Sequence, residues 1–128
     1  MVKRFLVNFL LIDDFFKLRL MPDFFNDVRE VVALIPKGRV STYGAIARFL
    51  GASKSSRVVG WVLNKSVNVD QVPAHRVVNR YGFLSGKQHF QTVSYMEELL
   101  TKEGVIIKND MVLNFNDLFW DPSIELRW

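Results

Sequence analysis

The sequence predicts a mainly helical protein with a small β element. Three observations lead to this class. Apolar residues recur at helical spacing over residues 24–35, two more short helical segments follow at 41–50 and 55–64, and two β-prone segments come late in the chain. Two short helices joined by a few residues are typical of a helix-turn-helix, and a later hairpin can form its wing. Because the 128 residues are 49% hydrophobic, enough for one core, we expect a winged helix-turn-helix-like single domain over residues 21–128.

The first predicted helix, residues 24–35, has clear start and stop signals. Pro22 and Asp23 are typical of a helix start, whereas Pro36 and Gly38 are typical of a helix end. The residues expected to face the core are Phe24, Val28, Val31, Val32 and Ile35.

The second predicted helix has Ser41 as its N-cap and ends at Leu50, with Gly51 after it. Its expected core residues are Ala45, Ile46, Phe49 and Leu50.

The third predicted helix begins near Ser55 and ends at about Asn64, and its two faces differ. Val59, Val62 and Leu63 are expected to face the core. Arg57, Trp61 and Asn64 share the opposite face because they are spaced at i, i+4 and i+7. Gly60 lies among them, although a glycine inside a helix costs roughly 1 kcal/mol relative to alanine. Close approach of another backbone, from protein or nucleic acid, would explain this glycine.

The rest of the chain predicts a loop, a helix and a hairpin. Residues 80–87 contain two glycines and polar turn residues, which is typical of a loop. A further helix is expected over residues 92–103, ended by Gly104, and a hairpin from residues 105–107 and 111–113. The inward residues of that helix are expected to be Val93, Met96, Leu99 and Leu100. The aromatic tail, expected to pack back on the body, contains Phe115, Leu118, Phe119, Trp120 and Trp128.

Positive charge is concentrated in the middle of the chain. Residues 36–90 contain nine basic side chains against the single acid Asp70, a balance of +8, and the remainder carries −4 to give the net +4. This distribution is typical of a face that binds a polyanion such as nucleic acid. The nine residues are Lys37, Arg39, Arg48, Lys54, Arg57, Lys65, Arg76, Arg80 and Lys87.

Residues 1–20 are predicted to be an N-terminal extension. Lys3 and Arg4 precede an apolar run, but Asp13 and Asp14 close it after about eight residues, too early for a membrane span or a typical signal peptide. The segment is either an added amphipathic helix or an upstream extension before a usual start at Met21. The absence of cysteine excludes disulfides, thiolate metal sites and a cysteine nucleophile, and it fits a cytoplasmic protein.

The most informative motif is Pro73-Ala74-His75-Arg76-Val77-Val78. It is one of four motifs that follow one another along the chain. The other three are Ile35-Pro36-Lys37-Gly38-Arg39-Val40-Ser41-Thr42-Tyr43-Gly44, Ser56-Arg57-Val58-Val59-Gly60 and Glu103-Gly104. Over about residues 24–120 the chain resembles the C-terminal domain of the O6-alkylguanine-DNA alkyltransferases, in which a Pro-Cys-His-Arg-Val motif carries the cysteine that accepts the alkyl group. Because Ala74 stands at the cysteine position, the chain is similar to the alkyltransferase-like proteins, which bind the alkylated base without accepting its alkyl group.

The resemblance implies a role for each matching residue. Arg57 would enter the base stack from the minor groove, and Tyr43 would press on the backbone and rotate the nucleotide out. His75 and Glu103 match the pair that activates the thiol, but no nucleophile remains for them to activate. The full expected DNA-binding set is Tyr43, Arg57, Gly60, Trp61, Asn64, Lys65 and Arg76. The expected base pocket is Ala74, His75, Val77, Tyr81 and Ser85.

The implied function is non-enzymatic recognition of O6-alkylguanine in double-stranded DNA. By resemblance, a monomer would flag the lesion for nucleotide excision repair proteins. No cofactor and no membrane association are expected. A metal site is not expected either, because neither His75 nor His89 has partners at metal-ligand spacing. Two alternatives remain: a sequence-specific transcription regulator built on the same helix-turn-helix, and a true methyltransferase with an engineered cysteine-to-alanine change at position 74.

Overall fold

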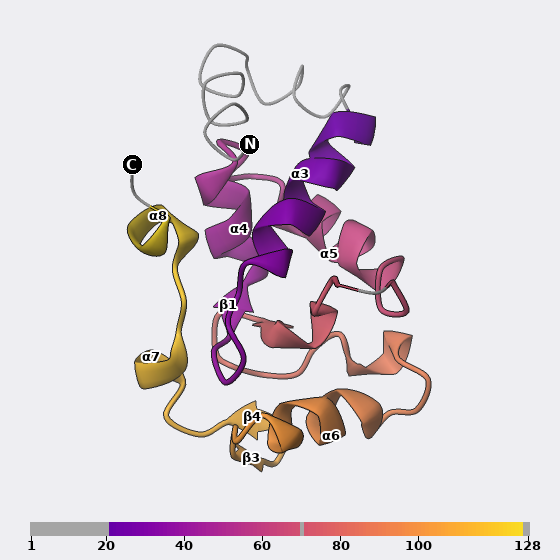
Figure 1. Cartoon of the computed structure of the whole chain (residues 1–128), viewed down its shortest axis with the longest axis vertical. Coiled ribbons are helices and arrows are strands. Elements are labelled where there is room, and N and C mark those ends of the chain that lie inside the picture. Colours follow the sequence, from indigo (N-terminus) through magenta and orange to yellow (C-terminus); the bar gives the residue numbers. More distant parts are fainter. Residues whose placement is uncertain (1–20, 70, 127–128) are drawn as a thin grey trace.

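The computed structural model describes residues 21–69 and 71–126 of the chain. The predicted extension at residues 1–20 and the predicted packing of Trp128 fall outside these ranges. Figure 1 shows the helices of the N-terminal half at one end of the molecule, a smaller group of elements at the other, and a C-terminal segment that runs along one side. The larger helices are α3 (Met21–Ala33), α4 (Tyr43–Phe49), α5 (Ser56–Asn64) and α6 (Tyr95–Lys102).

The first core lies between α3, α4 and α5. Every residue that we expected to point inward from the first helix is buried, although the helix itself ends at Ala33 and its last turn gives way to a loop. α4 packs on α5, and Gly51 adopts a φ of +75° between them, so the predicted helix-turn-helix is confirmed. The inner face of α5 is also as predicted: Val59, Val62 and Leu63 are buried.

Two short strands that pair in parallel flank this unit in the sequence, one before it and one after it. β1 (Ser41–Thr42) pairs with β2 (Val77–Val78), which follows a single 3₁₀ turn, η1 (Ala74–Arg76). The prediction of Ser41 as the N-cap of α4 is therefore wrong, because Ser41 lies in β1. Thr42 is the cap, and its side-chain oxygen accepts a 3.1 Å hydrogen bond from the backbone N–H of Ala45.

A second, smaller core lies at the other end of the molecule. α6 packs there against the hairpin of β3 (Ile107–Lys108) and β4 (Met111–Val112), which confirms the predicted hairpin. The helix is shorter than the predicted range 92–103, and the prediction that Val93 points inward is wrong. Val93 comes before the first residue of α6, so it does not lie on the inward face of that helix, and it is 65% exposed. This core consists of Val40, Val78, Leu84, Met96, Leu100, Val105 and Val112.

The two cores lie next to each other. Phe90 packs against both, and it follows the 3₁₀ turn η2 (Lys87–His89). The chain between Leu84 and Phe90 therefore bridges the two ends of the molecule.

The C-terminal segment packs back on the body, as expected. Trp120 is buried, and its backbone N–H donates a 2.7 Å hydrogen bond to the carbonyl of Val40. The Arg39 guanidinium donates to the carbonyls of Leu118 and Phe119. Two short helices, α7 (Phe115–Leu118) and α8 (Pro122–Glu125), lie on this segment.

The observed architecture matches the predicted class, a mainly helical fold with a small β element. Within residues 21–69 and 71–126, no helix combines the length and apolar character that a bilayer crossing requires.

Candidate nucleic-acid interface

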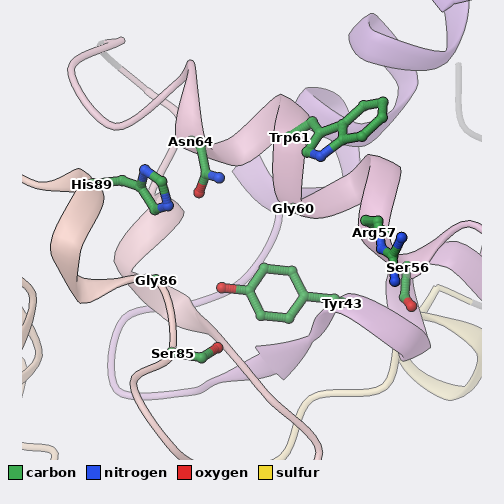
Figure 2. A pocket seen from close by; sticks show the side chains of 9 residues that line it. All are labelled: Tyr43, Ser56, Arg57, Gly60, Trp61, Asn64, Ser85, Gly86 and His89. Carbon is green, nitrogen blue, oxygen red and sulfur yellow. The ribbon is translucent and has the colours of Figure 1, made fainter.

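The outer face of α5 forms one wall of an open cleft of about 420 Å³, here called the α5 cleft (Figure 2). Three of its lining residues, Arg57, Trp61 and Asn64, are the ones that helical spacing placed on the face opposite the core. Trp61 is 52% exposed, a large apolar ring that the core does not use. The complete lining is Tyr43, Ser56, Arg57, Gly60, Trp61, Asn64, Ser85, Gly86 and His89.

Tyr43 crosses the middle of the cleft. It is the first residue of α4, directly after the Thr42 cap, so its backbone is held by the end of the helix. Figure 2 shows its hydroxyl pointing from α4 toward Ser85 and Gly86 on the opposite wall. Burial raises the pKa of the Tyr43 phenol above its ordinary value, and a hydrogen bond with the Ser85 side chain acts in the opposite direction. The phenol is therefore neutral at pH 7 and can donate a hydrogen bond.

Two glycines give this tyrosine its space, and they do so differently. A Cβ on Gly86 would lie 2.9 Å from the Tyr43 hydroxyl, so a side chain there would displace the ring or the loop. A Cβ on Gly60 would lie 3.9 Å from the ring, which is an ordinary contact. Packing within the described residues thus explains Gly86 but leaves Gly60, a costly residue inside α5, without an intramolecular reason.

Ala74 begins the η1 turn and is only 6% exposed. It belongs to the first core and is not part of the lining of the α5 cleft. The structure therefore shows the predicted acceptor position as a closed apolar site.

Glu103 holds the η1 turn in place through contacts with three residues of two segments. Its carboxylate accepts hydrogen bonds from Arg76 at 2.7 Å and from the backbone N–H of Gly38 at 3.2 Å, and it lies 2.8 Å from Nε2 of His75. Arg76 also donates to the carbonyl of Ile35 at 2.7 Å. The carboxylate thus ties η1 to the loop after α3, a structural role that needs no nucleophile.

Glu103 and His75 differ in charge at pH 7. Burial alone would raise the pKa of Glu103, but the hydrogen bonds from Arg76, His75 and Gly38 outweigh it and lower the pKa to about 2. Burial lowers the pKa of His75, and the attraction of Glu103 only partly opposes that effect. At pH 7 Glu103 is therefore charged, whereas His75 is neutral and able to donate Nε2–H to it.

The structure does not bring every predicted site residue to the cleft. Arg76, predicted to bind DNA, is bonded to Glu103 with a side chain only 11% exposed. Val77, predicted to line the base pocket, is fully buried in β2. Tyr81 is 62% exposed but lines a neighbouring cleft, and Lys65 is exposed at the end of α5.

Three lining residues were not predicted, namely Ser56, Gly86 and His89. Ser56 is the residue before Arg57, and the helical register could have indicated it. Gly86 and His89 come from the bridging loop and η2, and nothing in the local sequence shows that this loop lies opposite α5.

Some of the basic side chains of residues 36–90 bind other groups of the protein itself. Arg39 and Arg76 bind carbonyls or Glu103, and Lys87 forms a 2.6 Å ion pair with Asp110. Arg57 remains at the α5 cleft, and Arg48 and Arg80 line the neighbouring cleft. Among residues 21–69 and 71–126, no group of three or more His, Cys, Asp or Glu residues could hold a metal ion.

Comparison with known proteins identifies the family. The profile described as "6-O-methylguanine DNA methyltransferase, DNA binding domain" matches residues 23–105. The chain is 34% identical over 106 residues to alkyltransferase-like protein 1 of Schizosaccharomyces pombe, covering 80% of this chain and 98% of that protein. It is 33% identical over 94 residues to the DNA base-flipping protein of Escherichia coli, covering 73% and 71%.

Solved structures agree with this family. The fold matches S. pombe Atl1 in complex with damaged DNA containing O6-carboxymethylguanine, with a TM-score of 0.71, 34% identity, and coverage of 79% of this chain and 97% of that chain. A second structure of S. pombe ATL with DNA gives a TM-score of 0.68 at 31% identity.

The chain therefore belongs to the family of the 6-O-methylguanine DNA methyltransferase DNA-binding domain. Within it the chain is of the alkyltransferase-like type, because its 128-residue sequence has alanine at position 74 and no cysteine.

Proposed function

We propose that this protein binds O6-alkylguanine in double-stranded DNA, extrudes the damaged nucleotide, and transfers no alkyl group. The observation that carries the proposal is the meeting of Tyr43 and Arg57 at one cleft, in a chain whose acceptor position is filled by Ala74. The relative of known structure that binds DNA containing O6-carboxymethylguanine supports the choice of lesion.

In this proposal, α5 lies in the minor groove and Arg57 enters the base stack. The Arg57 side chain is exposed at the N-terminal part of α5, where its length and planar cationic head suit the space that an extruded base leaves. Gly60, one turn later on the same face, allows the DNA backbone to come close to the helix. Because such contacts are mostly to the sugar-phosphate backbone, binding depends little on the surrounding sequence.

Tyr43 would guide the nucleotide from the α5 cleft toward Ala74. In the described structure the phenol points toward the wall that carries Ser85 and Gly86, and Ala74 is buried. In this proposal the Tyr43 side chain moves away from this wall when the base enters. Contacts of the phenol with a DNA phosphate would hold it in the new position.

Alkyl transfer is absent in this proposal because no thiol is present. The neutral imidazole of His75, which follows Ala74 in the sequence, and the charged carboxylate of Glu103 that is bonded to it remain, but both hold the η1 turn in place. We also propose that a cytoplasmic monomer hands the lesion to nucleotide excision repair. The hand-off is supported by the family resemblance.

The test is a binding titration with two matched duplexes, one with a single O6-methylguanine and one with guanine. We expect clearly tighter binding to the damaged duplex and an unchanged protein mass after incubation. Equal affinities would contradict lesion recognition and would favour a sequence-specific regulator. A methylated protein, or guanine restored in the oligonucleotide, would contradict the absence of transfer.

A further inference from the structure

A second cleft adjoins the α5 cleft and has no role in the function proposed above. It has a volume of about 610 Å³ and shares Tyr43 and Ser56 with the α5 cleft, so the two clefts adjoin at these residues. We call it the flanking cleft. Its lining is Thr42, Tyr43, Gly44, Arg48, Ser56, Asn79, Arg80, Tyr81, Phe115, Asn116 and Phe119, a set with two arginines and no acidic residue.

The two arginines approach the flanking cleft from different elements. Arg48 extends from the end of α4 back along the helix, and its Nη1 lies 3.4 Å from the place where a Cβ on Gly44 would stand. Arg80 comes from the loop after β2. Its guanidinium lies 4.8 Å from the centroid of the Tyr81 ring and donates a 2.6 Å hydrogen bond to the phenol oxygen. Both arginine side chains belong to exposed residues.

The loop that carries Arg80 is held by local hydrogen bonds and by a glycine that fits its backbone. The side-chain oxygen of Asn79 accepts hydrogen bonds from the N–H groups of Tyr81 and Phe83 at 2.9 and 3.0 Å. Gly82 has a φ of +85°, and a Cβ there would lie 3.1 Å from the Phe115 ring. The loop therefore holds two exposed side chains, the cation Arg80 and the aromatic ring of Tyr81, although neither of them packs in a core. Such placement is typical of a binding residue.

We propose that the flanking cleft binds the phosphodiester backbone of the lesion strand next to the extruded nucleotide, through Arg48 and Arg80. This inference rests on the proposed function, in which Tyr43 guides the damaged nucleotide at the α5 cleft. Because Tyr43 and Ser56 also line the flanking cleft, the backbone next to that nucleotide would lie in the flanking cleft. Guanidinium groups bind phosphate oxygens bidentately, and the lining has no carboxylate that would repel them. Tyr81 is then a positioning residue that holds Arg80, and not part of the base pocket.

The test combines charge-removing variants with neutral backbone linkages. Duplexes with one O6-methylguanine carry a single methylphosphonate at successive positions on either side of the lesion. Wild-type protein should lose affinity at one or two linkages beside the lesion. Arg48→Ala and Arg80→Ala should each bind the unmodified lesion duplex about tenfold more weakly, with a salt dependence reduced by about one phosphate. Each variant should no longer respond to the methylphosphonate that its arginine contacts.

The matched control is Lys54→Ala, an exposed cation between α4 and α5 that lines neither cleft. It should retain the wild-type response to every methylphosphonate. Arg80→Lys keeps the charge but loses the bidentate guanidinium group. Its affinity should therefore lie between those of Arg80→Ala and the wild type. If both arginine variants keep the full methylphosphonate response, the flanking cleft does not bind this backbone. That result differs from failure of the proposed function, in which wild-type protein itself would show no preference for the lesion.

Discussion

Replacing Gly60 by alanine should stabilise the protein and weaken its binding to DNA. The added Cβ lies 3.9 Å from two carbons of the Tyr43 ring, so it meets no clash within the described residues. Position 60 lies inside α5, where alanine is favoured over glycine by about 1 kcal/mol. For a chain of this size, that gain corresponds to a rise in Tm of about 4 °C.

The same methyl group should obstruct DNA. Gly60 lines the α5 cleft between Arg57 and Trp61, where a backbone would have to approach closely. We expect at least about a tenfold loss of affinity for a duplex with O6-methylguanine, which corresponds to about 1.4 kcal/mol. The perturbation thus separates fold from function, because its effects on stability and on binding have opposite signs.

Thermal unfolding and fluorescence anisotropy with a labelled duplex measure the two effects. Thr101→Ala is the matched control, because Thr101 is an exposed residue of α6 that lines neither cleft, and alanine raises helix propensity there as well. It should raise Tm slightly without changing the affinity. The reasoning is refuted if Gly60→Ala lowers Tm, which would show that the space beside Tyr43 is needed for packing, or if it binds the lesion as wild type does.

Three further predictions concern the lesion, the carboxylate cluster and the adduct. Arg57→Ala should reduce the preference for O6-methylguanine over guanine, whereas Lys54→Ala should leave that preference unchanged; paired titrations measure this, and an unchanged preference in Arg57→Ala would make Arg57 one more phosphate contact. Glu103→Gln should destabilise the protein by about 3 kcal/mol at pH 7, because it leaves the buried charge of Arg76 without its partner. The carboxylate's contribution is complete above its ordinary pKa of 4.5 and is lost as the pH falls toward about 2, so denaturant titrations should show the difference between wild type and variant shrinking over that range, and a constant difference would contradict the lowered pKa. Larger O6 adducts should bind about as well as methyl, because Ala74 leaves more room than cysteine; a steep loss of affinity with adduct size would contradict this.

Helical periodicity predicted the parts of this fold that repeat a local pattern. The inner face of α3, the helix-turn-helix and the separation of Arg57 and Trp61 from the core all follow from spacing within one helix. The motif at Ala74 indicated the family because its neighbours stand in a recognisable order.

Contacts between distant segments could not be predicted in the same way. The strands β1 and β2 have two residues each, too few for any alternation to show, and their pairing moved the cap of α4 from Ser41 to Thr42. Arg76 looked like a free cation, and only folding brings it to Glu103, 27 residues later. The same limit applies to His89, whose place opposite α5 depends on how the bridging loop packs.

The walls of the α5 cleft belong to different cores, and this has a consequence for how recognition can change. α5 and Tyr43 rest on the first core, whereas the segment that begins at Leu84 is anchored in the second. A substitution deep in either one, such as Met96→Leu, can therefore tilt one wall against the other while every side chain that meets the ligand stays the same. Selection for a different adduct can act through buried positions as well as through those that line the opening.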